Sequence, residues 1–598
     1  FAVASWASLG VFFMRGTEPD DPVWLPGAIL IGSAITSALL ALFCRAGLVP
    51  VGAVVVAAAC VMGVALRGKA ASHVARESFN ALRSSAGRWG SIAALVLGGV
   101  AWVYAIAPPR EADAMRYHLA HIRQIIADGQ WQPIADFHYG IPFAWTLNFL
   151  PFELIGLPQA AQVTALLLLL VMVGAFLRIA SRYRQPRWGL LVTALFVSHP
   201  LVIRTFTAAT ADCYATFVLF TSGLLLLRSP RFSAGEAALL GFAGWTGVGS
   251  RYQLIVWGAL VSLVFAWSLR GKSDAGVLIK RFAAGVVAAV VLASPFYIVN
   301  LLAFGNPVWP FFVSRHAGES SYVAAIARGY SDALVAGVTP AALIDKLIAI
   351  VKPGPDFPLA AVTLGVCVAG LFSRVRPVRI LSAAGLLFAL AWLPSWPVLY
   401  TRLVLPAIGV ALLIALCFRD REAERIPHVI VVFAVAASTL MASATIYAGT
   451  DQLRYAVTGD TQRFHRYTWF YDLYDRVNRS TPKDSRFLVV VYSGHSYYLD
   501  RFYRRADPWL SAVVDWRRVT SGAALDSALS AGRYDWMIYQ LRDWSPFIGG
   551  GEMTRAVADA IRTGYLIPDT VFREKLYTSR IGRRYETSDV LLLRRRNP

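Results

Sequence analysis

The chain has few charged residues and few cysteines for its length. Only 16% of its 598 residues are charged, whereas soluble domains average about 25%. Its five cysteines form no Cys-x-x-Cys pair and lie in or beside apolar runs, which excludes a disulfide scaffold and predicts buried thiols: Cys44, Cys60, Cys213, Cys367 and Cys417. Hydrophobic residues make up 57% of the sequence, so a disordered chain is excluded as well.

Acidic residues are also scarce. The sequence has 36 Asp and Glu against 57 Lys and Arg, a formal net charge of +21. The basic residues are dispersed between apolar segments and form no single stripe, which argues against nucleic acid and indicates cytoplasmic loops with anionic lipid or phosphate partners. Because the first residue is Phe1, we expect the natural start of the chain to lie further upstream.

Long apolar runs recur from residue 25 to about 449 and predict a polytopic α-helical membrane protein. We interpret them as about 13 spans: 25–44, 51–66, 91–107, 158–180, 188–207, 208–227, 237–250, 251–269, 282–304, 358–372, 380–394, 403–418 and 426–449. The stretch 237–269 must hold two short helices or one broken helix. No internal repeat is found, and such a repeat would have indicated a transporter.

The basic loops give an orientation. Clusters of Arg and Lys at 67–88, 178–187, 228–231, 270–281, 374–379 and 419–425 all fall on one side of the predicted spans, which should be cytoplasmic. Three long segments then lie on the outer side: 108–157, 305–357 and 450–598. We expect residues 1–90 to be extra N-terminal transmembrane helices, and 91–449 to form a transmembrane module that carries the first two outer segments as loops.

The C-terminal segment is a different kind of sequence. Residues 451–598 hold 24 Lys and Arg and 17 Asp and Glu, a sharp rise in charge that predicts a soluble domain over 450–598. Short apolar runs predict strands at 487–492, 536–541 and 590–593, which alternate with helical patterns near 465–479, 522–532 and 552–563. We expect a small α/β domain. It contains no nucleophile elbow, P-loop or Gly-rich dinucleotide loop.

The first outer loop carries the densest group of reactive side chains. Glu111 and Asp113 directly follow a predicted span, and Tyr117, His118 and His121 follow within two turns of a helix expected to lie in the membrane interface. The two carboxylates could serve only the helix dipole. The histidine spacing permits zinc, but no third nearby ligand completes a site, so ordinary hydrogen-bonded histidines are expected.

A second outer acidic residue, Asp212, lies between two apolar runs. Ionisable residues beside spans are costly and indicate function, although a helix N-cap is the alternative.

These segments resemble one family. Asp113-Ala-Met-Arg-Tyr-His is similar to the D-x-x-x-Y-H signature of GT-C glycosyltransferases, in the RgtA/B/C/D-like and dolichyl-phosphate-mannose:protein mannosyltransferase-like branch. Further segments resemble that group in the same order over roughly residues 91–510: Thr207-Ala-Ala-Thr-Ala-Asp212, Gly247-Val-Gly-Ser-Arg251-Tyr, Pro295-Phe-Tyr-Ile-Val-Asn300, Gly305-Asn306-Pro-Val-Trp-Pro310 and Leu399-Tyr-Thr-Arg402-Leu-Val-Leu-Pro406. Three features depart from the pattern: Arg251 replaces the usual Lys, Tyr400 precedes Arg402, and spans precede residue 91.

The resemblance implies an inverting transfer of a sugar from a polyprenyl-phosphate donor to an envelope glycan, lipid or protein, outside the bacterial cytoplasmic membrane. It implies Asp113 as the base, with Glu111 as substitute, and Asp212 as a residue that orients the acceptor or, with Asp113, holds a divalent metal (Mg or Mn). Substrate-binding candidates are Tyr117, His118, Arg251, Arg402, Asn300 and Asn306. The two arginines could instead snorkel to headgroups, and the two asparagines could instead shape the outer loop.

Two other functions remain open from the sequence. A transporter or flippase for an anionic lipid or lipid-linked sugar would explain charges beside spans, but not the large outer domain. A scaffolding membrane protein would leave the acidic residues of the first outer loop unexplained. Sugar and acceptor are not encoded in any readable motif.

Overall fold

The computed structural model describes residues 2–11, 21–59, 61–62, 76, 98–182, 186–227, 232–311, 322–326, 339–341, 344–345, 348, 359–392, 405–417, 428–466, 468–492, 495–579 and 584–596. The chain folds as two compact units. Unit 1 comprises residues 1–108, 142–297 and 333–456, and unit 2 comprises 109–141, 298–332 and 457–598.

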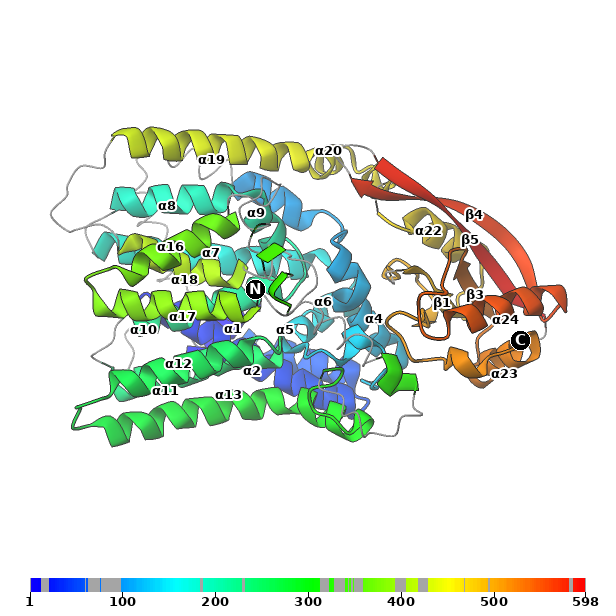
Figure 1. The fold of residues 1–598 in the computed structure, drawn as a ribbon, viewed down its shortest axis with the longest axis horizontal. Coiled ribbons are helices and arrows are strands. Elements are labelled where there is room, and N and C mark those ends of the chain that lie inside the picture. Colours follow the sequence, from blue (N-terminus) through cyan, green and yellow to red (C-terminus); the bar gives the residue numbers. More distant parts are fainter. Residues whose placement is uncertain are drawn as a thin grey trace. The chain divides into compact units, whose positions relative to one another are not determined.

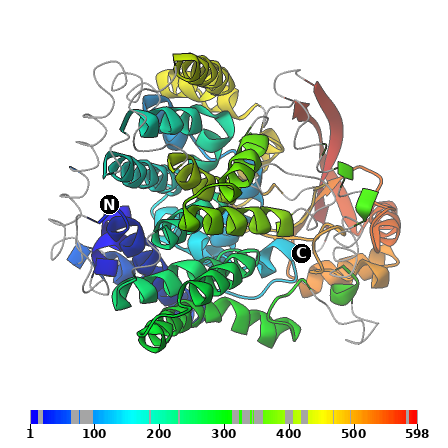
Figure 2. The same ribbon diagram turned by 60° about the vertical axis from the view of Figure 1, so that its left-hand side comes forward.

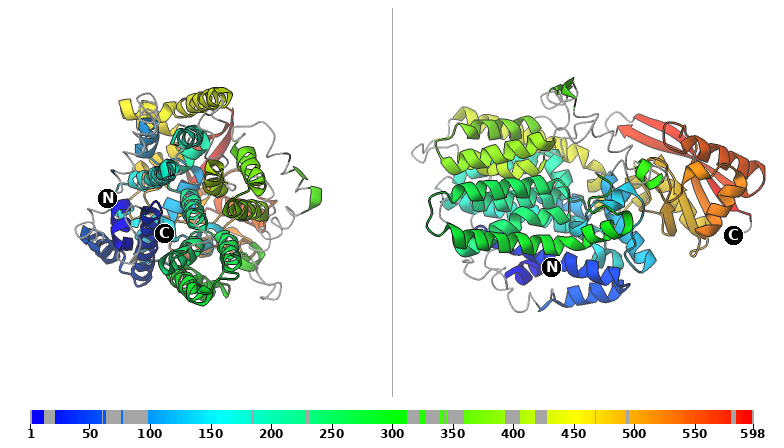
Figure 3. Two further views of the ribbon diagram at one scale, coloured as in Figure 1. Left: turned by 90° about the vertical axis from the view of Figure 1, so that its left-hand side faces the viewer. Right: turned by 60° about the horizontal axis from the view of Figure 1, so that its bottom comes forward.

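Unit 1 is helical in the part that the structure describes. Figure 1 shows its long helices running side by side, and the left view of Figure 3 looks along them. In Figure 2, the neighbouring α11, α12 and α13 are coloured green. The principal helices are α1 (Ala2–Val11), α2 (Trp24–Arg45), α7 (Gln159–Arg182), α8 (Pro186–Ser198), α9 (Pro200–Phe206), α10 (Asp212–Leu226), α11 (Ala234–Thr246), α12 (Leu254–Ser268), α13 (Ala275–Phe304, which continues into unit 2), α16 (Leu359–Leu371), α17 (Arg376–Trp392), α18 (Leu405–Leu416) and α19 (His428–Ala448).

Helices coincide with the apolar runs predicted to span the membrane. Among the described residues, three helices are long and apolar enough to cross a bilayer, namely Trp24–Arg45, Gln159–Ser181 and Ala275–Phe304, and up to five if each bent pair forms one span. Most other apolar helices have 10–17 residues, such as Asp212–Leu226 and Leu254–Ser268. The total of about 13 spans therefore stays a prediction.

Two breaks in the helices follow from local sequence. Pro200 lacks an amide proton, and the preceding His199 accepts a hydrogen bond from the Leu201 amide through Nδ1 (3.1 Å). The chain bends by 75° between α8 and α9 at this point. The stretch 237–269 forms two helices, α11 and α12, which are separated by the 3₁₀ turn η3 (Gly247–Gly249). The two-helix interpretation is therefore correct.

Unit 2 contains a five-stranded sheet in the order β2-β1-β3-β5-β4 (Figure 1). Strands β1 (Arg486–Val490), β2 (Phe502–Arg505) and β3 (Trp536–Gln540) are parallel, whereas β5 (Arg584–Arg595) runs antiparallel to both β3 and β4 (Leu566–Ser579). Helices α23 (Gly522–Ala531) and α24 (Gly550–Arg562) cover one face, where Leu525 and Val557 join a core with Val490. Helix α22 (Tyr471–Ser480) covers the other face through Leu473 and Val477.

Several of these elements coincide with the segments of the predicted α/β pattern. Strands β1, β3 and β5 and helices α22, α23 and α24 fall on the predicted segments. Strands β2 and β4 were not predicted, since β2 reads Phe-Tyr-Arg-Arg and β4 carries exposed charged residues on one face. The compact unit also differs from the predicted 450–598 domain, because it includes residues 109–141 and 298–332.

The first outer segment is joined to the C-terminal segment by backbone hydrogen bonds. The Phe137 amide donates to the Leu510 carbonyl (2.8 Å), and the Ala512 amide donates to the Ala135 carbonyl. These bonds flank an isolated β-bridge between Asp136 and Ser511. The expected interfacial helix is η1 (Ala114–His118) continued by α4 (Leu119–Asp128), and its described ion pairs reach the region of β2.

Candidate functional site

Asp113 lies in unit 2 at the start of the first outer helix. Its side chain is 5% exposed, and its Oδ2 accepts a hydrogen bond from the Tyr117 hydroxyl (3.1 Å). The turn that follows is π-helical, over Ala114–His118. Such one-turn π segments are rare and occur frequently at functional sites. Asp113 makes no side-chain N-cap hydrogen bond, so a dipole-capping role alone does not account for its position.

Two histidines that the sequence analysis did not select lie close to this turn. The His138 ring meets the Tyr117 ring edge-on, with centroids 4.5 Å apart. Burial, followed by the positive charges of Arg505 and Arg116, lowers the pKa of His138 well below its ordinary value, while Asp113 acts in the opposite sense. Burial and the same two arginines lower the pKa of His495 as well. Both imidazoles are therefore neutral at pH 7 and add no positive charge near Asp113.

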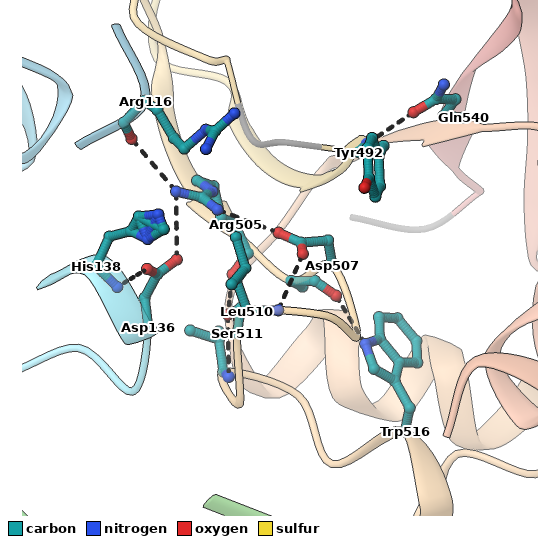
Figure 4. A network of polar contacts seen from close by, with 12 residues as sticks. Arg116, Asp136, His138, Tyr492, Arg505, Asp507, Leu510, Ser511, Trp516 and Gln540 are labelled. Carbon is teal, nitrogen blue, oxygen red and sulfur yellow. Dashed lines mark hydrogen bonds and ion pairs between the residues drawn. The ribbon is translucent and has the colours of Figure 1, made fainter. Parts of the chain in front are cut away.

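A buried ion network fixes the loop that carries His138 (Figure 4). Arg505, at the end of β2, contacts Asp136 (Nη1–Oδ2, 3.5 Å) and Asp507 (Nη2–Oδ2, 3.3 Å), and it donates to the Arg116 carbonyl (3.3 Å). All three charged side chains of the triad are at most 3% exposed. Asp136 also accepts from the His138 amide (3.0 Å). Because the guanidinium connects three chain segments, it holds His138 and the Asp113 helix in one arrangement.

The acid–base balance of this triad is set by its burial. Burial raises the pKa of Asp136 to about 6, against the opposing charge of Arg505, and the second carboxylate at Asp507 adds to the rise. Burial by itself lowers the pKa of Arg505, but Asp136 and Asp507 reverse this and the net shift is upward. Arg505 therefore stays charged. The sequence offered one signal for it, a pair of adjacent arginines between the predicted strand at 487–492 and the predicted helix near 522–532.

Asp212 lies in unit 1, as the first residue of α10, and is paired with Arg251. Their side chains, 7% and 14% exposed, approach to 2.7 Å (Arg251 Nη2–Asp212 Oδ1). The N-cap position belongs to Ala211, so the capping alternative for Asp212 is not what the structure has. The sequence analysis selected both residues but did not predict that they pair.

The glycine-rich turn before Arg251 explains how this pair forms. The Arg251 amide donates to the Gly247 carbonyl (3.1 Å), and Ser250 Oγ accepts from the Trp145 amide (3.0 Å). A Cβ at Gly249 would lie 3.2 Å from the side chains of Ala144 and Ala293, so only glycine fits here without displacing a neighbour. The turn thus fixes where the arginine leaves the backbone.

A small pocket opens beside this pair. It is lined by Asp212 and Arg251 together with Gln253, Phe388 and Pro406, among others. Pro406 is the last residue of the predicted motif Leu399–Pro406. Arg402, in the same motif, lies outside the described residues. The pocket therefore joins three segments that the resemblance had indicated separately: the Asp212 segment, the Arg251 turn and the start of α18.

The remaining candidates lie in unit 2. The Asn300 amide donates to the Gly140 carbonyl (2.7 Å), and Asn306 both donates to the Phe311 carbonyl (2.7 Å) and accepts from the Val308 amide (3.0 Å). The structure thus gives both asparagines the loop-forming contacts that were the alternative to substrate binding. His118 is buried beside Tyr117, with ring centroids 4.3 Å apart. Glu111 is partly exposed, two residues before Asp113.

The donor set for a metal is incomplete in the part of the chain that the structure describes. No group of three or more His, Cys, Asp or Glu side chains among those residues could hold a metal ion. One oxygen of Asp212 is already bound to Arg251 at 2.7 Å. A divalent ion at Asp212 would have to displace or share that guanidinium. The described residues of this pair therefore do not fit the predicted metal.

Comparisons with known proteins give structural neighbours only. No family model and no curated protein matches the sequence. Among solved structures, the chain is similar to ArnT from Cupriavidus metallidurans in the apo state and bound to undecaprenyl phosphate. The identity is 15%, 84% of this chain is covered, ArnT is covered over 97% and 98% of its length, and the TM-scores are 0.49 and 0.48.

The arabinofuranosyltransferase AftD from Mycobacteria is also similar, at 17% identity and a TM-score of 0.43, over 85% of this chain. The chain spans 40% of the length of that protein. All these TM-scores lie below 0.5.

Proposed function

We propose that this chain is a membrane glycosyltransferase of the GT-C type. It would move a sugar, with inversion, from a polyprenyl-phosphate donor to an acceptor on the outer face of the bacterial cytoplasmic membrane. The observation that carries the proposal is the Asp113 site: a buried carboxylate directly before a π-helical turn, bonded to the Tyr117 hydroxyl at 3.1 Å and electrostatically coupled to two neutral imidazoles.

Asp113 is suited to act as the base. An inverting displacement needs one group that takes the proton of the acceptor hydroxyl as that oxygen attacks the anomeric carbon. Tyr117 holds one carboxylate oxygen in place through its hydroxyl, and the neutral rings of His138 and His495 add no positive charge near the carboxylate. The leaving group is a phosphate, which departs without needing a proton. One base is therefore enough.

The phosphate charge needs a cation, and Arg251 is suited to supply it. Asp212 orients the Arg251 guanidinium through the contact at 2.7 Å, so we propose Asp212 as a positioning residue for Arg251. Arg402 is the second proposed phosphate ligand. Basic side chains that stabilise the developing charge replace the Lewis acid that a metal would provide.

The divalent metal predicted from the resemblance remains a separate proposal. Since the Asp212 pair does not fit a metal ion, we derive no step through one. Transfer measured with and without EDTA, followed by Mg²⁺ or Mn²⁺, tests it directly. Full activity in EDTA supports an arginine-based site, whereas loss that only the added cation restores would support the metal.

The experiment that tests the function uses the full chain in detergent and a radiolabelled polyprenyl-phosphate sugar. A glycosyltransferase releases lipid phosphate and incorporates label into an envelope glycan, lipid or protein extract. A flippase or scaffold would leave the donor intact, and an intact donor after incubation with the full acceptor extract would refute the proposal. The same assay with pentose and hexose donors identifies the sugar.

A further inference from the structure

The C-terminal α/β fold carries a layered aromatic group that the proposed chemistry does not use. Tyr492 and Trp509 stack nearly in parallel, with ring centroids 5.0 Å apart and an interplanar angle of 12°. The Arg542 guanidinium lies over Tyr492, with its Cζ 3.8 Å from the ring centroid. Phe547 lies beside both rings at 6.4 and 6.2 Å. We name these four residues the stack.

The stack occupies a favoured place for a ligand. Tyr492 follows β1, Trp509 follows β2, and Arg542 and Phe547 follow β3, so all four leave the carboxyl ends of parallel strands. The chain passes from β1 to β2 on one side and then to β3 on the other. In open α/β sheets, ligands bind outside the carboxyl ends of the strands at such a reversal of strand order.

The stack lies at the surface and packs over two buried tryptophans. Its four side chains are partly exposed, while Trp516 and Trp544 beneath are fully buried. Both buried indoles donate to backbone carbonyls, Trp516 to Ala506 (2.7 Å) and Trp544 to Gln540 (3.1 Å). A fixed, partly exposed aromatic group provides contact area at little cost in side-chain entropy.

Arg542 gives the stack a charge. Among the described residues its guanidinium makes cation–π contacts but no ion pair, and the adjacent Asp543 carboxylate accepts from the Ser545 amide instead (2.9 Å). Arginine binds carboxylate and phosphate with two parallel hydrogen bonds. A ligand that suits the stack therefore combines an apolar ring face for Trp509 with an anionic group for Arg542.

An acidic sugar has this combination, since one face of a sugar ring consists of C–H groups. We propose that the stack is a saccharide subsite for an acidic sugar of the acceptor. This inference rests on the proposed function. The stack is close to the proposed base along the chain. Tyr492 lies three residues before His495, and the charge of Asp113 acts on the pKa of His495. Three residues span at most about 11 Å.

The test measures equilibrium binding without any donor. The full chain in detergent is titrated against fluorescent oligogalacturonate, which is acidic, and fluorescent maltohexaose, which is neutral, with anisotropy as the readout. We expect the acidic probe to bind roughly tenfold more tightly, as for one charge-assisted contact. Trp509→Ala should weaken both probes at least about fivefold, and Arg542→Ala should weaken the acidic probe alone.

Two control variants exclude general effects of charge and of aromatic removal. Arg518→Ala removes an arginine whose side chain is 81% exposed, and Tyr565→Ala removes an exposed aromatic residue before β4; both should bind like the parent. If Trp509→Ala unfolds, Trp509→Leu and Arg542→Gln replace the pair of variants. Unchanged binding of the acidic probe in the folded stack variants, or an equal loss in the controls, overturns the subsite.

The binding and transfer measurements distinguish a failure of the subsite from a failure of the proposed function. Asp113→Asn should bind the acidic probe like the parent and yet transfer no sugar. If the parent shows no transfer while the stack variants still lose binding, the transferase proposal fails and the subsite stands. If transfer is found but the stack variants bind normally, the subsite fails alone.

Discussion

Replacing Asp113 by Asn is the sharpest test of the proposed chemistry. The change is nearly isosteric and removes the negative charge. The amide oxygen of Asn can still accept the Tyr117 hydrogen bond seen at 3.1 Å. Asp113→Ala, by contrast, would leave the Tyr117 hydroxyl without this acceptor, at a cost of about 1–3 kcal/mol. Asn therefore separates chemistry from folding.

The expected loss of activity follows from the proposed role of Asp113 as the general base. Removing a general base lowers the rate by roughly 10²–10⁴-fold, which is about 3–5 kcal/mol of transition-state stabilisation. The assay is the release of lipid phosphate from the labelled donor, with the melting temperature of each variant as the folding control. Since donor binding does not use this group, KM for the donor should change little while kcat falls.

Glu111→Gln is the matched control, because Glu111 is a carboxylate two residues away and only partly exposed. It should keep activity within a few-fold of the parent. Full activity of a folded Asp113→Asn variant would refute the assignment. If Glu111→Gln were the inactive variant, the base would be reassigned to Glu111.

Three further predictions use other parts of the molecule. Arg251→Ala and Asp212→Ala should each raise KM for the donor, and the double variant should lose less than the sum, because either single variant already breaks the ion pair between the two residues; additive losses would contradict the pairing. Arg402→Ala should cost about 1.5–3 kcal/mol in donor use, with only partial rescue by Lys, since Arg can meet two phosphate oxygens; unchanged kinetics would mean that Arg402 only snorkels. Burial lowers the pKa of His121 to about 3. Below about pH 6.5, His121 is therefore protonated in the unfolded chain but stays neutral in the folded chain. The contribution of His121 to stability should fall by about 1 kcal/mol per pH unit from pH 6 to 4, so the slope of melting temperature against pH should differ between the parent and His121→Phe; an equal slope in both would exclude this histidine. Asp136, with its pKa raised to about 6, acts in the opposite sense and is common to both proteins.

The sequence by itself determined what depends on short-range pattern. The spacing of Asp113 and Tyr117 is that of neighbours on one helical face, and the structure joins them by a hydrogen bond. The apolar runs coincide with helices, and β1 and β3 were recognisable because both lie in the middle of the sheet and are buried on both faces.

Tertiary structure alone decided which distant residues meet. Asp212 and Arg251 were each selected from their own motif, but their ion pair depends on how the glycine turn packs against α10. Strand β2 was not predicted because two adjacent arginines are typical of a solvent-exposed loop. The tertiary structure pairs them with acidic residues, Arg504 with Asp128 and Arg505 with Asp136. Charged residues can be buried where residues of opposite charge pair with them. Those residues come from segments far apart in the sequence, so local sequence patterns do not predict the pairs.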